Sequence, residues 1–99
     1  ALKDYNTALK DLEQAAYYDN NTNPRIYFEA AYIMMQQGLA IPAMKQNRFE
    51  LAIRNLQQSI QMNPDFLEAY QNLAYAYQEL GDTENAQKYM MLLQQRLQN

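Results

Sequence analysis

The residues that could carry chemistry in this 99-residue chain are carboxylates, lysines and tyrosines, because the chain has no histidine and no cysteine. This removes the commonest general base, the commonest metal ligand and every thiolate site. Two carboxylate pairs stand close in sequence, Asp11 with Glu13 and Asp65 with Glu68. Such pairs suit a solvated helix face, or a first helical turn where acids favour the helix dipole, better than acid–base catalysis or an all-oxygen metal site. The sequence therefore predicts no enzyme, no metal centre and no cofactor.

Charge and hydropathy exclude further classes of function. The net charge is −3, from 8 basic and 11 acidic residues, and no basic run exists, which argues against nucleic acid and anionic membranes as partners. No stretch approaches the roughly 18 to 20 apolar residues of a membrane span. We expect a soluble segment. The absence of Cys with few Lys and many Gln fits a bacterial cytoplasmic, periplasmic or envelope protein, and the compartment stays open.

The composition predicts an all-α fold. Hydrophobic residues make up 48% of the chain, with only 2 Gly and 3 Pro, and Ala, Leu, Gln, Glu and Met are all good helix formers. Apolar spacing and turn residues predict about five helices, over residues 2–18, from 24 to 38 or 41, a third ending near 62, 64–80 and 83–97.

Asparagine–proline pairs are the predicted helix starts. Asn23-Pro24 and Asn63-Pro64 each place a good N-cap before a residue that has no N–H to lose. Gly38 is expected to end the second helix and Pro42 to open a lengthened third one, although the second helix could instead overrun before the chain turns back. Gly81 with Asp82 predicts the last turn.

Segments of the chain resemble one another. Ala8, Ala52 and Ala86 each begin a similar stretch, with a large apolar residue four positions later. The spacing from Ala52 to Ala86 is 34 residues, whereas that from Ala8 to Ala52 is 44. The ten additional residues fall in the Asn-rich loop 19–23 and in segment 38–47.

This pattern resembles the tetratricopeptide repeat, a 34-residue helix–turn–helix. The residues that carry the resemblance in the last unit are Tyr70, Leu73, Ala74 and Tyr77, then Ala86 and Met90. The middle unit supplies Phe49, Ala52, Leu56 and Pro64, and the first supplies Tyr5, Ala8, Leu12 and Ala15. The resemblance implies one domain, residues 1–99, built as a superhelical array of antiparallel hairpins: a half repeat 1–20, a repeat with insertions 23–63 and a repeat 64–98. We expect small Ala residues at close approaches, large ones including Met90 between hairpins, and a longer array of which this is a piece.

The resemblance also implies a function. Similar arrays are non-enzymatic scaffolds that bind an extended peptide or a helix of another protein in the groove lined by first helices. Because neither first helix carries Lys, carboxylate-clamp binding is not expected, and the ligand should be apolar or mixed. Carried over to this chain, with Pro24 aligned to Pro64, the groove positions are Phe28, Ala31, Tyr32 and Met35 in the middle unit, and Gln71, Tyr75, Gln78 and Glu79 in the last.

A second hypothesis is self-association. The end of the last predicted helix, from Met90 to Leu97, is apolar enough that something should cover it. The chain could therefore be an oligomerisation module that pairs through its apolar ends, and a homo-oligomer stays open beside the scaffold hypothesis.

Overall fold

The chain forms five α-helices in the computed structural model, which describes the backbone of residues 2–98 and the side chains of residues 4–98. The helices are α1 (Leu2–Tyr18), α2 (Pro24–Ala40), α3 (Lys45–Met62), α4 (Leu67–Glu79) and α5 (Thr83–Gln98), with a 3-10 turn η1 (Pro42–Met44) directly before α3. No strand occurs within residues 2–98. The predicted all-α fold is confirmed.

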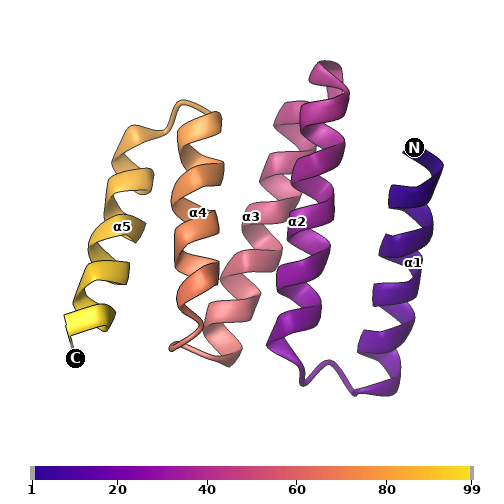
Figure 1. Ribbon diagram of the computed structural model, residues 1–99, viewed down its shortest axis with the longest axis horizontal. Helices are drawn as coiled ribbons and strands as arrows, with labels where there is room; N and C mark the ends of the chain where they lie inside the picture. Colours follow the sequence, from indigo (N-terminus) through magenta and orange to yellow (C-terminus); the bar gives the residue numbers. More distant parts are fainter. Residues whose placement is uncertain (1, 99) are drawn as a thin grey trace.

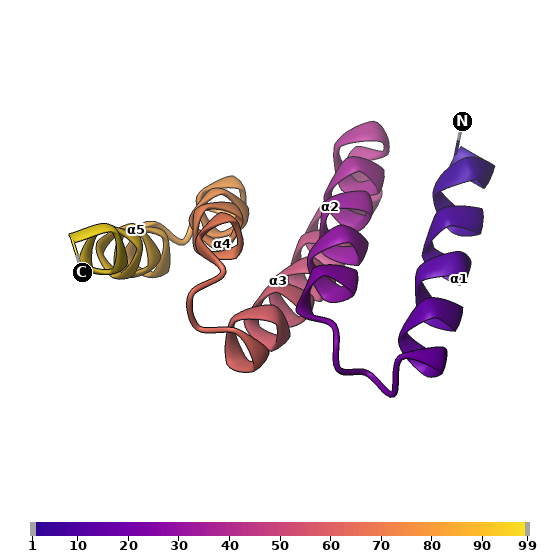
Figure 2. The ribbon, with the colours of Figure 1, turned by 60° about the horizontal axis from the view of Figure 1, so that its bottom comes forward.

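The helices follow one another in space as they do in sequence (Figure 1). Successive helices run in opposite directions, and the two ends of the chain lie at opposite ends of a slab that measures 39 × 33 × 15 Å. Figure 2 shows α1 and α2 upright while α4 and α5 are seen nearly end-on, so the helix direction rotates along the array. This is the predicted arrangement of antiparallel hairpins with a superhelical twist.

The two Asn-Pro pairs make matching hydrogen bonds but are followed by different structures. Asn23 caps α2, since its side-chain oxygen accepts a hydrogen bond from the Arg25 amide at 3.0 Å and Pro24 is the first helical residue. The Asn63 side chain likewise accepts from the Asp65 amide at 3.1 Å, and its carbonyl accepts from the Phe66 amide at 3.0 Å, but Asn63 also ends α3 and the residues after it form a turn. The prediction that Pro64 opens a helix is therefore wrong, because α4 begins three residues later, at Leu67.

Gly38 does not end α2. It is buried inside the helix, where an added Cβ would lie 3.0 Å from the Phe49 ring and 3.2 Å from the Lys45 backbone. Its predicted role as a helix stop is wrong, and its place in the sequence reflects the close approach of α2 and α3. The predicted start at Pro42 is confirmed, because η1 leads from this residue into α3.

The core joins α2 through α5. Its buried small residues include Ala52, Ala74 and Ala86, and its large ones Leu56, Tyr70 and Leu73, as predicted. Met90 is 44% exposed, so its predicted core position is wrong. The adjacent Tyr89 is buried in its place and stacks on Tyr77 with 5.7 Å between ring centroids.

The turn between α4 and α5 forms as predicted. Gly81 has a φ of 80°, the left-handed conformation that favours glycine. Asp82 then caps α5, since one carboxylate oxygen accepts from the Asn85 amide at 3.1 Å and the other from the Asn85 side chain at 2.7 Å. These two hydrogen bonds lower the pKa of Asp82.

Candidate protein-interaction surface

The residues that could support catalysis are used in other ways. Asp65 pairs with Arg96 of α5 at 2.8 Å, and Glu68 pairs with Arg25 of α2 at 3.4 Å. Only Glu68 lies in a first helical turn, because Asp65 belongs to the turn before α4. Within the described residues, no group of three or more Asp or Glu side chains could hold a metal ion. These carboxylates therefore tie neighbouring helices together.

Tyr77 lies in a cluster of polar groups that changes its pKa. Burial raises its pKa, the nearby Tyr89 and Asp82 raise it further, and a hydrogen bond from Gln57 opposes them. The Gln57 amide donates to the Tyr77 hydroxyl at 3.2 Å and to the Tyr89 hydroxyl at 3.4 Å. A phenol with a raised pKa stays protonated at neutral pH, so this cluster links α3 to the α4–α5 hairpin and does not supply a base.

The predicted positions on α4 form an exposed stripe. Gln71, Tyr75 and Gln78 are exposed, and Tyr75 retains 41% of its surface while its ring lies 6.2 Å from that of Phe49. Glu79 is half-buried, and its carboxylate is 3.1 Å from the Lys45 ammonium. The stripe is therefore polar with one aromatic ring, and its acidic end is neutralised by α3.

The predicted positions on α2 divide between surface and core. Tyr32 is 53% exposed, whereas Met35 retains 3% and Ala31 none of its surface. Phe28 is half-buried and stacks on Phe66 with 5.0 Å between ring centroids. Ala31 and Met35 therefore belong to the core, and their predicted place in an exposed groove is wrong.

The reason is a shift of one residue in the alignment of α2 with α4. Matching Pro24 with Pro64 sets an offset of 40, but Pro64 lies outside α4. An offset of 39 matches buried residues with buried residues, because it pairs Ala31 with Tyr70 and Met35 with Ala74. The α2 residues that then correspond to the exposed stripe on α4 are Tyr32, Gln36 and Leu39.

Leu39 is the surface position that the sequence reasoning missed. It is 44% exposed, next to the buried Gly38. Gly38 was the feature of the sequence that could have revealed it. A glycine where two helices approach closely marks the buried side of α2, and Leu39 follows it on the helix.

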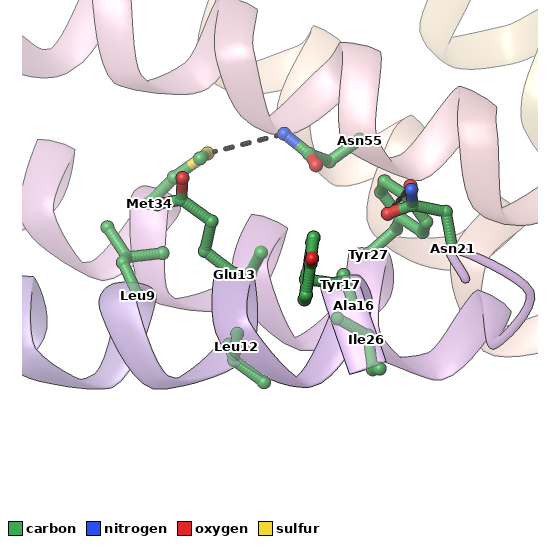
Figure 3. Close-up of a pocket in the computed structure, with 11 residues that line it drawn as sticks. Leu9, Leu12, Glu13, Ala16, Tyr17, Asn21, Ile26, Tyr27, Met34 and Asn55 are labelled. Carbon is green, nitrogen blue, oxygen red and sulfur yellow. Dashed lines mark hydrogen bonds between the residues drawn. The ribbon is translucent and has the colours of Figure 1, made fainter. Parts of the chain in front are cut away.

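A pocket of about 570 Å³ lies on another side of α2, between α1 and α2 with one residue of α3 (Figure 3). The α1 wall contains Leu9, Leu12 and Tyr17, with Glu13 as its carboxylate. The remaining lining residues are Ala16, Asn21, Ile26, Tyr27, Ala30, Met34 and Asn55. Leu12, one of the residues that carry the resemblance in the first unit, thus lies in the wall of an apolar hollow.

Polar contacts hold the edges of this pocket. The Tyr27 hydroxyl donates to the Asn21 side chain at 3.1 Å, and the Asn55 amide lies 3.5 Å from the Met34 sulfur. At the other end of α1, the Gln37 amide donates to the Asn6 side chain at 3.1 Å. Both Asn20 and Asn21 have positive φ, 53° and 57°, which asparagine tolerates better than most residues.

Known proteins share this architecture. The family model described as TPR repeat matches residues 44–81. One crystal structure of MamA matches with a TM-score of 0.83 and 21% identity, over 96% of this chain and 50% of its own, and a second has a TM-score of 0.79 and 22% identity, over 93% and 45%. The chain thus spans about half the length of these MamA structures.

At this identity the likeness to MamA is one of fold. No curated protein sequence matches the chain. No helix within residues 2–98 is long and apolar enough to cross a membrane. Residues 44–81 therefore match the tetratricopeptide repeat, and the antiparallel helices continue over the rest of residues 2–98 in the same fold as MamA.

Proposed function

We propose that the chain is a non-enzymatic scaffold that binds a segment of another protein, an extended peptide or a helix, on the exposed faces of α2 and α4. The observation that carries this proposal is the pair Tyr32 and Tyr75, which are exposed on consecutive first helices of the array. Exposed tyrosines supply much contact area at little cost in conformational entropy and are enriched at interface hot spots.

The two faces are close enough to act together. Arg25 and Phe28 of α2 contact Glu68 of α4 and Phe66 just before it. Further along, Gly38 of α2 and Tyr75 of α4 both lie against Phe49 of α3. A segment that lies across these helices would therefore contact Tyr32, Tyr75, Gln71 and Gln78, whose helices are held in place by packing on each other and on α3.

The chemistry of the faces favours an apolar or mixed ligand. Their aromatic rings and side-chain amides carry no charge, and Glu79 and Glu68 each form an ion pair with a basic side chain. Lys45, the nearby ammonium group, is held by Glu79 at 3.1 Å. A carboxylate of a partner would have to compete with that pair, so we do not expect recognition of a chain terminus.

The test uses peptides selected on the intact chain from a random-peptide display library. We expect the double variant Tyr32→Ala, Tyr75→Ala to bind the selected peptides at least tenfold more weakly, because each substitution removes exposed aromatic contact area. Tyr18→Ala is the matched control, since this tyrosine is exposed on α1, and it should bind as the unmodified chain does.

Circular dichroism and the urea midpoint establish that each variant is folded. Equal binding by the folded double variant and the control would overturn the proposal. Selected peptides that lose affinity only in the Tyr18 variant would do the same.

A further inference from the structure

We propose that the chain associates with a second copy of itself, head to tail, by placing the exposed apolar side chains of α5 in the pocket between α1 and α2 of the next copy. The proposal concerns a different side of α2 from the one that holds Tyr32. Each residue of a helix advances by about 100°, so Ala30 in the pocket and Tyr32 lie on nearly opposite sides.

The pocket is suited to apolar side chains. Its volume of about 570 Å³ lies within the roughly 300–1,000 Å³ of typical binding pockets. Six of its eleven lining residues are apolar, namely Leu9, Leu12, Ala16, Ile26, Ala30 and Met34. Burial of long, flexible side chains there would remove apolar surface of both copies from water.

The exposed side chains of α5 are the complementary feature. Met90, Met91 and Leu97 retain 44%, 60% and 63% of their surface. Methionine adapts its shape to irregular hollows, which is why it is common at adaptable interfaces. These three residues form the apolar patch of α5.

The array itself shows what covers these positions elsewhere. Thirty-four residues before Met90 and Met91 stand Leu56 and Gln57 of α3. Leu56 is fully buried, and the Gln57 amide donates to hydroxyls of Tyr77 on α4 and Tyr89 on α5. On α3 this face is covered by the following hairpin, whereas on α5 the same face is exposed among the described residues.

Charge favours a second copy as the occupant. Helix α1 has three acidic residues against two lysines, a balance of −1, whereas α5 has Lys88 and Arg96 against Glu84, a balance of +1. Glu13 is the charged group that lines the pocket. Lys88 precedes Met91 by three residues and so neighbours it on the helix surface, which would bring it toward Glu13 when Met91 is inserted.

The two surfaces lie at opposite ends of the molecule, so α5 can reach the pocket only of another copy (Figure 1). A contact between two different surfaces is heterologous, and it continues from copy to copy until a ring closes. A single helix face buries less than the roughly 1,200–2,000 Å² of a standard interface, so we expect association only at high protein concentration.

Sedimentation equilibrium of the intact chain over a concentration series tests the proposal. We expect the average mass to rise beyond that of a dimer. Met91→Glu should abolish the rise by charging the patch, and Ala30→Phe should abolish it by filling the pocket. Gln61→Glu, an exposed position on α3 with the same change in charge, is the matched control and should associate as the unmodified chain does.

Mixing the two variants gives the decisive result. Met91→Glu keeps its pocket and Ala30→Phe keeps its patch, so the mixture should form a 1:1 dimer although neither variant associates alone. Association by Ala30→Phe alone would indicate contact between two α5 helices and would overturn the proposal.

A monomeric mixture of the folded variants, or a monomeric unmodified chain at the highest concentration, would overturn it as well. If the pocket instead takes a helix of another protein, the unmodified chain should stay monomeric, and the proposal is then overturned. The Tyr32 and Tyr75 variants should associate normally, which separates this proposal from the peptide-binding one.

Discussion

The two sides of α2 differ in how well they are filled. Toward α3, Gly38 lies so close to Phe49 that an added Cβ would be 3.0 Å from the ring, and Ala31 and Ala52 retain no exposed surface. Toward α1, a pocket of about 570 Å³ separates the helices. The difference shows that α2 and α3 form one packed hairpin, on which α1 rests as a more loosely attached element.

Stability should therefore be uneven along the chain. Elements with few buried apolar contacts open at lower free energy than the core does. Among the side chains described for α1, residues 4–18, Ala16 is the one buried hydrophobic residue, and Tyr17 and Tyr18 at the end of the helix are largely exposed. We expect α1 to detach from the packed helices before the array unfolds.

The largest loss of stability that tests the difference between the two sides of α2 is expected from Phe49→Ala. The side chain is fully buried, so its removal should lower the free energy of unfolding by about 3–5 kcal/mol. Leu12→Ala, in the pocket wall, removes a half-buried side chain and should cost about 1 kcal/mol. Urea denaturation followed by circular dichroism measures both, and equal losses would show that the two sides of α2 are equally important.

A smaller effect is expected from Gly38→Leu. Leucine is a good helix former, so helix propensity favours the change, and the loss must come from the collision with Phe49. Overpacking of this kind typically costs about 1–3 kcal/mol.

The double variant with Phe49→Ala is the control for that cause. The leucine can then occupy the space vacated by the ring, so the two losses should be less than additive by more than about 0.5 kcal/mol. Additive losses would mean that Gly38 is needed for a reason other than its contact with Phe49.

Sequence reasoning succeeded where a local rule and the packing agree. Asn23-Pro24 caps a helix in the structure, where α1 has already ended at Tyr18 and a turn separates the two helices. The same dipeptide at residues 63 and 64 makes matching hydrogen bonds, but Asn63 also ends α3, and the chain turns before α4 begins at Leu67. A local pattern cannot reveal that the preceding helix already uses the residue.

The exposed faces depended on register, which is less secure than helix position. A one-residue error in aligning α2 with α4 placed the buried Met35 in the groove and left out Leu39. The same sensitivity explains why Met90 was wrongly predicted in the core. Its side chain points about 100° away from that of Tyr89, so Met90 is exposed while Tyr89 stacks on Tyr77. The pocket could not be predicted, because it depends on how far α1 stands from α2.

The smallest effect concerns the polar contact between α1 and α2. Gln37 retains 4% of its surface, its amide nitrogen donates to Asn6, and its Oε1 has no partner among the described residues. Asn6→Ala removes the partner of the nitrogen as well. A buried amide without partners would normally cost about 1–3 kcal/mol, but α1 can move away and admit water, so we expect a loss near the lower end that is confined to α1.

Amide hydrogen exchange should then show faster exchange throughout α1 and unchanged exchange in α3. Adding Gln37→Leu to Asn6→Ala should restore the protection of α1, since the buried amide is then absent and an apolar side chain faces the helix. Equal acceleration in α1 and α3 would mean that α1 unfolds together with the core. In that case the open side of α2 would be as firmly held as the filled one, despite the pocket between its helices.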